Sequence, residues 1–310
     1  MTSVTAFAPA TVSNVGCGFD VLGFALEAPG DEVTATFGPG GVKIEAIEGD
    51  GGRLPLDAGR NTAGVAALAL LTTIGERRGV SLRIRKGLPL SSGLGGSAAS
   101  AAAAVVAVDA LIGARSPLDV LVACALEGER LGAGSAHADN IAPSIYGGFV
   151  LVRRPSPPEV LRLPVPRGLT AVVIHPDLEI ETAKARALLG TTVPLGDAVR
   201  QWANMGALVD GLHRGDFAQI GRALEDTIAE PRRAPLIPGL ALIKRAAVGA
   251  GALGCSISGS GPSLFALCEN RETAGRVASA MDTAVRASIG GAPQTYISAI
   301  DAPGARVVST

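Results

Sequence analysis

The chain has 310 residues, of which 47% are hydrophobic and 18% charged, and its formal net charge is −1. This length allows one large domain or two ordinary ones with a sizeable core. A near-neutral charge without a long basic run argues against binding to nucleic acid or to an anionic membrane surface. Aromatic residues are scarce and glycines number 41, so we expect a core of small aliphatic side chains.

The cysteines and the first residues indicate the compartment. Cys17, Cys124, Cys255 and Cys268 form no Cys-x-x-Cys pair, which favours free buried thiols over a zinc site or a disulfide framework. The start of the chain lacks the basic and apolar regions of a secretory signal. The longest apolar run, Ala101–Val108, is too short to cross a bilayer. We therefore expect a soluble, cytoplasmic protein.

The first half of the chain mixes predicted strands and helices. Alternating apolar and polar residues over 80–85 predict a half-buried strand. Residues 97–112 are predicted as a helix, and a second helix begins at Ser116-Pro117, where a serine cap precedes proline at the first helical position. Residues 145–152 are predicted as a strand.

Residues 153–158, Arg-Arg-Pro-Ser-Pro-Pro, have the composition of a linker, so we place a domain boundary there. The expected domains are residues 1–155 and 160–310. Beyond the boundary we predict strands at 169–174, 255–258, 264–268 and 296–300, and helices at 182–189, 195–212, 240–250 and 273–287. Because strands and helices interleave in both halves, we expect an α+β fold with sandwich layers.

The segment from Pro89 to Ala99 connects the 80–85 strand to a helix and has three glycines in four residues. Backbone N–H groups at such a helix entry can point at an anion, helped by the positive end of the helix dipole. The segment is therefore a candidate phosphate cradle, although it lacks the Gly-Lys-Ser/Thr of a Walker loop. It also matches the dinucleotide pattern G-x-G-x-x-G/A, but residues 86–92 separate it from its strand. A plain glycine-rich turn is the remaining alternative.

One carboxylate lies on the predicted core face of the helix after Pro117. Leu118, Val122, Ala125 and Glu129 share a stripe at about 100° per residue, whereas Glu127 points nearly opposite. A carboxylate on a core-facing stripe needs a partner. Glu129 either reaches water at the helix end or binds magnesium near the phosphate loop, and periodicity does not choose between the two.

Polar residues in two other segments are candidate ligand groups. Asn14 and Asp20 lie in a glycine-spaced turn, where they could bind a ligand hydroxyl or amine or could cap their own backbone. His137 stands near Asn140, and a single histidine is more often a hydrogen-bonded structural group than a ligand. The other two histidines show no metal spacing relative to it.

Arginines from separate segments could bind a carboxylate. Thr182 and Arg186 are four residues apart and share a helix face, and Arg232-Arg233 follow Glu230-Pro231 in a proline-broken loop. Two such arginines could clamp a carboxylate bidentately. Taken by residue type alone, an ordinary solvated surface charge is favoured for each.

Taken together, these segments resemble the GHMP kinase superfamily, and within it the homoserine kinase family. The similar segments are a substrate loop (13–20), a phosphate loop (89–99), a central signature (134–148), a substrate-arginine loop (230–239) and the motif Gly259-Ser260-Gly261-Pro262. They extend from about residue 4 to 268 in the family's order.

The resemblance implies a fold and an activity. The fold would be α+β, with a two-layer GHMP kinase architecture: an N-terminal ATP-binding domain like domain 2 of ribosomal protein S5, and a C-terminal ferredoxin-like α/β sandwich that completes the substrate site. The activity would be the Mg²⁺-dependent transfer of the ATP γ-phosphate to the hydroxyl of L-homoserine, a step of threonine biosynthesis. A homodimer is implied as well.

The resemblance also implies residue roles. ATP would contact Asn61 and the loop residues Pro89, Leu90, Ser91, Ser92, Gly93, Leu94, Gly95, Gly96, Ser97, Ala98 and Ala99. Ser97 and Glu129 would hold Mg²⁺. The amino-acid substrate would contact Asn14, Asp20, His137, Asn140, Arg186 and Arg233. In this set Asp20 would bind the reacting hydroxyl, and the two arginines would bind the carboxylate.

Asp20 and Thr182 are the candidate catalytic residues. Some relatives such as mevalonate kinase carry Asp where this chain has Thr182, which is a poor base at neutral pH. Positioning and charge stabilisation can supply most of the barrier reduction in phosphoryl transfer. We therefore expect catalysis without a base at Thr182, with Asp20 orienting the hydroxyl and accepting its proton late.

One loop residue departs from the family. The family's loop usually reads Gly-Leu-Gly-Ser-Ser, and Gly96 replaces the first serine here. Because Ser97 keeps the magnesium position, we expect activity to survive. The alternatives to a homoserine kinase are another GHMP small-molecule kinase, of mevalonate or sugar type, and a non-catalytic small-molecule sensor on the same fold.

Overall fold

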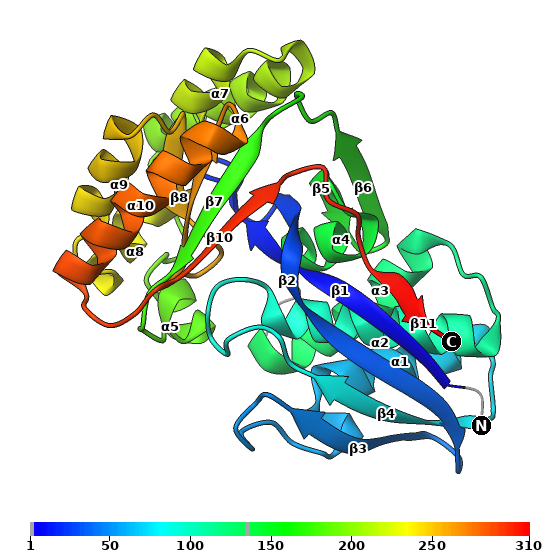
Figure 1. Ribbon diagram of the computed structural model, residues 1–310. Coiled ribbons are helices and arrows are strands. Elements are labelled where there is room, and N and C mark those ends of the chain that lie inside the picture. Colours follow the sequence, from blue (N-terminus) through cyan, green and yellow to red (C-terminus); the bar gives the residue numbers. More distant parts are fainter. Residues whose placement is uncertain (1–2, 134–136) are drawn as a thin grey trace.

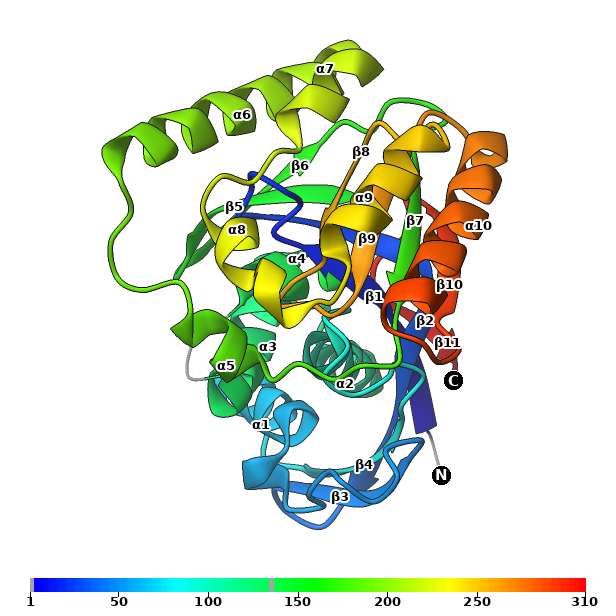
Figure 2. The same ribbon diagram turned by 90° about the vertical axis from the view of Figure 1, so that its left-hand side faces the viewer.

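The computed structural model describes residues 3–133 and 137–310. Within these ranges the strands form two sheets, and helices pack against both (Figures 1 and 2). The last strand returns to the first sheet, where it pairs antiparallel with the first strand. The ends of the chain therefore belong to the same sheet.

The first sheet has the strand order β11-β1-β2-β4-β3, and β5 pairs with β2 and with β6. Its strands are β1 (Ser3–Ser13), β2 (Leu22–Gly38), β3 (Val42–Glu48), β4 (Gly79–Arg85), β5 (Phe149–Pro155), β6 (Pro158–Leu163) and β11 (Arg306–Ser309). The predicted strand at 80–85 is β4, where Leu82 and Ile84 are buried and Arg83 and Arg85 are exposed.

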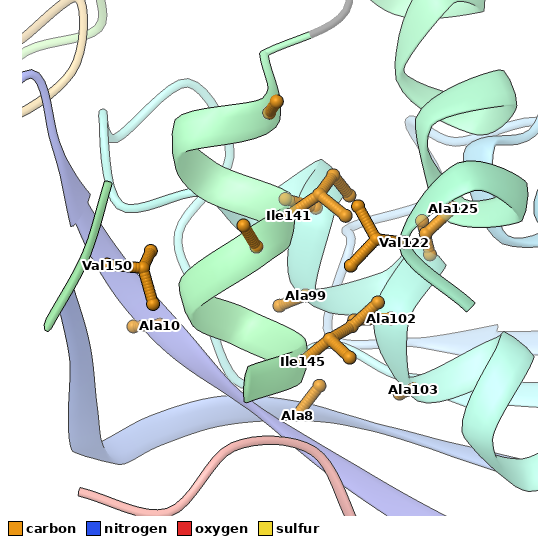
Figure 3. Packing of buried hydrophobic residues seen from close by; sticks show 14 of the residues in the cluster. Ala8, Ala10, Ala99, Ala102, Ala103, Val122, Ala125, Ile141, Ile145 and Val150 are labelled. Atoms are coloured by element: carbon orange, nitrogen blue, oxygen red, sulfur yellow. The ribbon is translucent and has the colours of Figure 1, made fainter. Parts of the chain in front are cut away.

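Helix α2 lies at the centre of the first half of the molecule. The helices here are α1 (Thr62–Ile74), α2 (Gly96–Ile112), α3 (Leu118–Ala133) and α4 (Ala138–Tyr146), with the 3₁₀ turn η1 (Ala58–Arg60). Helix α2 contacts β1, β2 and the other three helices. Its alanines lie close to Val122 of α3 and to Ile141 and Ile145 of α4 (Figure 3). This packing confirms the expected core of small aliphatic side chains.

The second sheet has the order β10-β7-β9-β8, and all its pairs are antiparallel. Its strands are β7 (Thr170–His175), β8 (Gly254–Ile257), β9 (Leu264–Cys268) and β10 (Gln294–Ala299). The helices of this half are α5 (Thr182–Ala187), α6 (Leu195–Arg214), α7 (Phe217–Ala223), α8 (Ala229–Arg233), α9 (Leu240–Gly249) and α10 (Arg271–Ser288), with the 3₁₀ turn η2 (Ala234–Leu236). Helices α9 and α10 cover one face of the sheet (Figure 2).

The other face of the second sheet packs on the first core. Phe265 of β9 meets Phe24 of β2 edge to face, with ring centroids 5.9 Å apart. Phe24 also contacts Phe149 of β5 at 5.6 Å. Because these rings are fully buried, they join the two sheets through one apolar layer.

Two predicted segments have a different structure. The predicted strand at 145–152 is wrong at its start, because α4 continues to Tyr146 and β5 begins at Phe149. Ile145 is apolar because it faces the core from a helix. Residues 153–158 form a hairpin, since β5 and β6 pair as far as Pro155 and Pro158. Proline and arginine mark an exposed turn there, and the division into domains 1–155 and 160–310 stays a prediction.

The four cysteines are free and buried, as the sequence predicted. Burial raises the pKa of the Cys17, Cys255 and Cys268 thiols to about 12, so these groups are protonated at neutral pH. Among the described helices, none combines the length and apolar character needed to cross a membrane.

Candidate active site

A cavity of about 630 Å³ brings most of the predicted site residues together. The predicted residues that line it are Asn14, Asp20, Asn61, Pro89, Leu90, Ser91, Ser92, Gly93, Gly95, Gly96, Ser97, Glu129, His137, Asn140, Thr182, Arg186 and Arg233. Leu94, Ala98 and Ala99 are instead packed in the core. The segments 13–20, 89–97 and 259–260 and the helices α5 and α8 therefore share one site.

The glycine loop needs glycine at particular positions. Gly95 has φ +67°, and a Cβ there would lie 2.2 Å from the Thr11 hydroxyl oxygen. A Cβ at Gly93 would lie 2.6 Å from the carbonyl oxygens of Ser258 and Gly261. Helix α2 begins directly after Gly95, which offers no capping side chain. The N–H groups of its first turn can therefore serve an anion.

Gly96 differs from these two glycines. A Cβ there would approach Leu88 Cβ and Lys86 Nζ to 3.7 Å and the Pro89 carbonyl oxygen to 3.8 Å, which are ordinary contact distances. Its backbone is outside the left-handed region. A serine would thus fit at this position, and the departure from the family's loop is not imposed by the backbone.

The predicted core-facing orientation of Glu129 is confirmed. Its side chain is buried, whereas Glu127 is exposed and pairs with Arg130 at 2.8 Å. The Glu129 Oε2 atom lies 3.7 Å from His137 Nδ1, and its Oε1 atom is buried without a hydrogen-bond partner. A hydrogen bond to this carboxylate raises the pKa of His137.

Glu129 and Ser97 are suited to magnesium. Ser97 is exposed at the start of α2 and lines the same cavity as Glu129. Within the described ranges no cluster of three or more His, Cys, Asp or Glu could hold a metal. Mg²⁺ commonly binds one or two protein oxygens and takes its remaining ligands from phosphates and water. The unpartnered Oε1 atom of Glu129 fits such a site.

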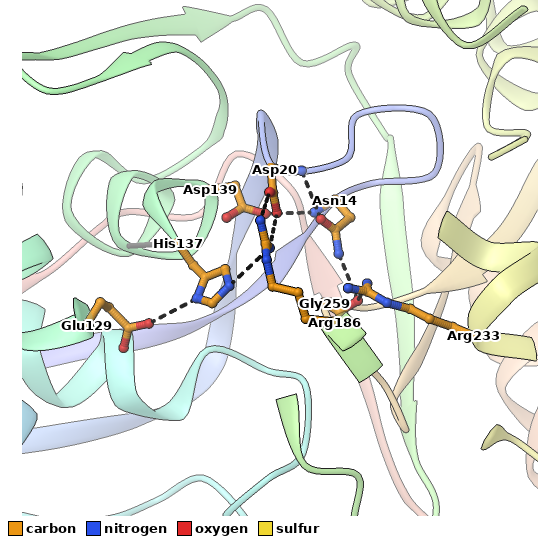
Figure 4. A network of polar contacts seen from close by, with 8 residues as sticks. All are labelled: Asn14, Asp20, Glu129, His137, Asp139, Arg186, Arg233 and Gly259. Atoms are coloured by element: carbon orange, nitrogen blue, oxygen red, sulfur yellow. Dashed lines mark hydrogen bonds and ion pairs between the residues drawn. The ribbon is translucent and has the colours of Figure 1, made fainter. Parts of the chain in front are cut away.

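A polar network connects the substrate loop to α5 (Figure 4). The Arg186 guanidinium donates to both carboxylate oxygens of Asp20, at 3.1 and 2.6 Å, and its Nη1 lies 3.5 Å from His137 Nε2. The pairing with Asp20 raises the pKa of Arg186. Arg186 is therefore a half-exposed charge that is paired across the cavity, and its role toward a substrate stays a prediction.

The substrate loop is held in an uncommon backbone conformation. Asn14, Val15 and Asp20 all have positive φ, of 69°, 41° and 59°. Asn and Asp tolerate this region, but a β-branched residue there is strained, and such strain concentrates at functional sites. The Asn14 Oδ1 atom accepts from the Asp20 N–H at 3.0 Å, so Asn14 does cap its own loop.

The motif Gly259-Ser260-Gly261-Pro262 joins the parts of the site. The Gly259 carbonyl accepts from Asn14 Nδ2 and from Arg233 Nη1, each at 2.8 Å. The preceding Ser258 hydroxyl donates to the Gly93 carbonyl at 2.7 Å. This turn of the second sheet thus aligns the substrate loop with the glycine loop.

Arg233 is one of the most buried charged groups of the site, with 4% of its surface exposed. Burial lowers its pKa, and its Nε atom is buried without a partner. The guanidinium lies 5.3 Å from the Phe19 ring centroid, and that of Arg186 lies 5.6 Å from the same ring. Two cations therefore flank Phe19, and a surface role for Arg233 is wrong.

Asp139 also lines the cavity, although it was not among the residues predicted for the site. Its side chain is buried, Oδ2 accepts from the Asn14 N–H at 3.2 Å, and Oδ1 has no partner. Burial raises the pKa of this carboxyl to about 6, with a further contribution from the charge of Asp20. Its place between His137 and Asn140 was the available signal.

The remaining predicted residues have structural partners. The Asn61 side chain caps α1 by accepting from the Ala63 N–H at 3.0 Å, and it donates to the Pro55 carbonyl at 3.1 Å. Asn140 Oδ1 accepts from the Thr11 hydroxyl at 2.8 Å. The Thr182 and Ser260 hydroxyl oxygens are 3.3 Å apart. Residues 134–136 of the predicted central signature lie outside the described residues.

Comparison with known proteins gives consistent matches. Residues 61–148 match the family model of the GHMP kinases N terminal domain, and residues 208–287 match that of the GHMP kinases C terminal. The homoserine kinase of Chlorobium phaeovibrioides (strain DSM 265 / 1930) is 51% identical, over 93% of each chain. That of Xanthomonas campestris pv. campestris (strain B100) is 42% identical, over 98% of this chain and 94% of the other. The crystal structure of homoserine kinase from Cytophaga hutchinsonii superposes with a TM-score of 0.96 and 49% identity, over 99% of this chain and 98% of that one.

Proposed function

Because the chain belongs to the GHMP kinase family, we propose that it is a homoserine kinase, which transfers the γ-phosphate of ATP to the hydroxyl of L-homoserine and forms O-phospho-L-homoserine. One observation carries this assignment beyond similarity. A single cavity combines a glycine loop suited to a triphosphate with buried arginine and aspartate side chains suited to an amino acid. ATP and Mg²⁺ are the cofactors of this reaction.

The nucleotide end of the cavity is formed by the glycine loop. The first-turn N–H groups of α2 would bind the triphosphate, and Ser97 and Glu129 would hold Mg²⁺. When bound, Mg²⁺ neutralises negative charge on the phosphate oxygens. The buried, unpartnered oxygen of Glu129 supports its assignment to the metal.

The substrate end suits a zwitterion. Arg186 and Arg233 would bind the carboxylate of homoserine, and the unpartnered oxygen of Asp139 would accept from its ammonium group. Arg186 is engaged by Asp20, but a guanidinium has five N–H donors and can bind two carboxylates. Asn14, His137 and Asn140 complete the pocket around the amino acid.

Asp20 would orient the reacting hydroxyl. Its carboxylate, held on both oxygens by Arg186, would accept the proton late, as the leaving group departs. Thr182 shares a hydrogen bond with Ser260 and would help to orient the phosphate acceptor rather than remove its proton. Positioning then supplies most of the rate enhancement.

A coupled assay of ADP release tests this proposal. We expect turnover with L-homoserine and Mg²⁺-ATP, and little turnover with mevalonate or galactose. A preference for mevalonate or galactose would assign the chain to a sister GHMP kinase. Binding of homoserine without ADP release would favour a sensor, although Ser97 and Glu129 argue for catalysis.

A homodimer that acts in the cytoplasm, apart from nucleic acid and membranes, is also part of this proposal. The net charge of −1 supports the separation from nucleic acid. An exposed apolar stripe on α6, formed by Leu195, Val199 and Trp202, supports self-association. These residues are spaced four and three positions apart, so they lie on one helix face.

A further inference from the structure

A buried ion pair lies beneath the glycine loop. The Lys86 ammonium pairs with the Asp31 carboxylate, and 1% and 0% of their side chains are exposed. The same ammonium donates to the Gly96 carbonyl at 2.7 Å and to the Ser100 hydroxyl at 2.9 Å. The Ser100 hydroxyl in turn donates to Asp31 Oδ2 at 2.6 Å, and the Gly87 N–H donates to Oδ1 at 3.0 Å.

Stability alone does not explain why a charged pair is buried at this position. Two charges lose their hydration on burial, and a well-packed apolar pair of similar volume is often at least as stable. Lysine is also disfavoured near the first turn of a helix, where the dipole is already positive. Residues that break such local rules are commonly functional.

The two members of the pair lie at different distances from the active site. Lys86 and Ser100 line the cavity, whereas Asp31 lies behind them on β2, against the N–H of Gly87. A Cβ on Gly96 would lie 3.7 Å from the Lys86 ammonium, so at this position the loop backbone, with no side chain, lies next to the ammonium. The positive member of the pair is therefore the one nearer to the expected triphosphate.

We propose that Lys86 is a positioning residue for the nucleotide. It holds the Gly96 carbonyl and so directs the first N–H groups of α2 toward the triphosphate, and its charge strengthens the attraction for phosphate. Its three N–H donors are already used by Asp31, Gly96 and Ser100, so it acts without touching ATP. A Walker loop contains its own lysine, whereas here Lys86 supplies the positive charge from outside the loop. This inference rests on the proposed ATP-dependent function.

Three variants separate this role from a purely structural one: Lys86→Met, Asp31→Asn and Ser100→Ala. The dissociation constant of Mg²⁺-ATP is measured by calorimetry, and the melting temperature is measured in parallel. We expect all three to melt lower than the wild type. Lys86→Met should weaken ATP binding by about tenfold, because the Gly96 carbonyl loses its donor and the phosphates lose a nearby positive charge. Asp31→Asn removes a negative charge and should leave ATP binding unchanged or tighter.

Ser100→Ala sets the baseline, because it removes hydrogen bonds of the same cluster without changing its charge. An ATP affinity of Lys86→Met no weaker than that of Ser100→Ala would overturn the proposal. A larger loss in Asp31→Asn than in Ser100→Ala would overturn it too. If Lys86→Met does not fold, the neutral double variant D31N/K86M is compared with D31N, and it should bind ATP more weakly. A wild-type protein that neither binds Mg²⁺-ATP nor phosphorylates homoserine would instead contradict the proposed function.

Discussion

Asp139 is a buried carboxyl group of the site, and its ionisation affects the stability of the folded protein. The folded protein raises the pKa of this carboxyl from 3.8 to about 6, so folding favours its protonated form. The associated stability is fully present below the unfolded pKa and is lost as the pH rises through about 6. At neutral pH the ionised group costs stability, which is expected of a group kept for a ligand.

Asp139→Asn should therefore separate stability from binding. We expect a higher melting temperature than wild type at pH 8, and a KM for homoserine raised by about tenfold or more through loss of the ammonium partner. In the wild type, kcat/KM for homoserine should fall as the pH drops through about 6, where Asp139 takes up a proton. The assignment would be contradicted if kcat/KM of Asp139→Asn still fell as the pH drops through about 6, or if its KM for homoserine were unchanged.

Gly95 and Gly96 are adjacent, but we expect opposite effects when each is replaced by serine. Gly96→Ser should fold like the wild type and bind ATP at least as tightly, because its Cβ meets only ordinary contacts and its hydroxyl adds a donor near the phosphates. Gly95→Ser should lose about 1–3 kcal/mol from its left-handed backbone, and more from the close approach to Thr11. Thermal melts and ATP titrations of the two variants check this, and equal losses would contradict it.

At the scale of elements, α8 is short and depends on Asp226. This buried carboxylate accepts from the N–H groups of Ile228, Ala229 and Glu230 at 2.8, 2.9 and 2.8 Å. The Gln201 side chain donates to Asp226 Oδ1 at 3.1 Å and to the Cys17 carbonyl at 2.9 Å. Helix α6 thereby ties the start of α8, which carries Arg233, to the substrate loop.

Asp226→Ala should raise the KM for homoserine and leave the KM for ATP near the wild-type value, because it releases α8 and with it Arg233. A loss of stability of about 1–3 kcal/mol is expected from the unsatisfied donors. Asp216→Ala is the matched control, since Asp216 caps α7 through the Gln219 N–H at 2.9 Å but does not line the active-site cavity. It should destabilise the protein with both KM values unchanged, and an equal KM change in both variants would contradict this account.

At the scale of the whole molecule, the candidate active site lies where the two sheets meet. The glycine loop follows β4 of the first sheet, and the Gly259 turn connects β8 and β9 of the second. Hydrogen bonds join them directly, from the Ser258 hydroxyl to Gly93 and from the Gly259 N–H to the Ser13 carbonyl at 3.1 Å. Substrate and nucleotide positions therefore depend on the packing of both sheets.

The exposed apolar stripe on α6 allows the proposed homodimer to be tested. Trp202 is 64% exposed and is the only tryptophan of the sequence, so its fluorescence reports on this face. If a second copy covers the stripe, emission should shift to the blue as the protein concentration rises, and Val199→Ser should shift sedimentation toward the monomer. Val248→Ser on α9, at a residue 54% exposed, is the control and should not change sedimentation. A monomeric wild type would refute this interface.

The sequence by itself determined the features that depend on neighbouring residues. The glycine loop, the core-facing stripe of Glu129 and most elements after residue 169 follow from local periodicity and turn chemistry, and the resemblance to the GHMP kinases follows from motifs kept in order. Tertiary structure alone decided the pairing of Asp20 with Arg186, the burial of Arg233 and the cluster of Lys86 with Asp31. These residues are distant in sequence or lie on different elements. Periodicity shows which face of an element is apolar, whereas the partner of a charge depends on how the elements pack.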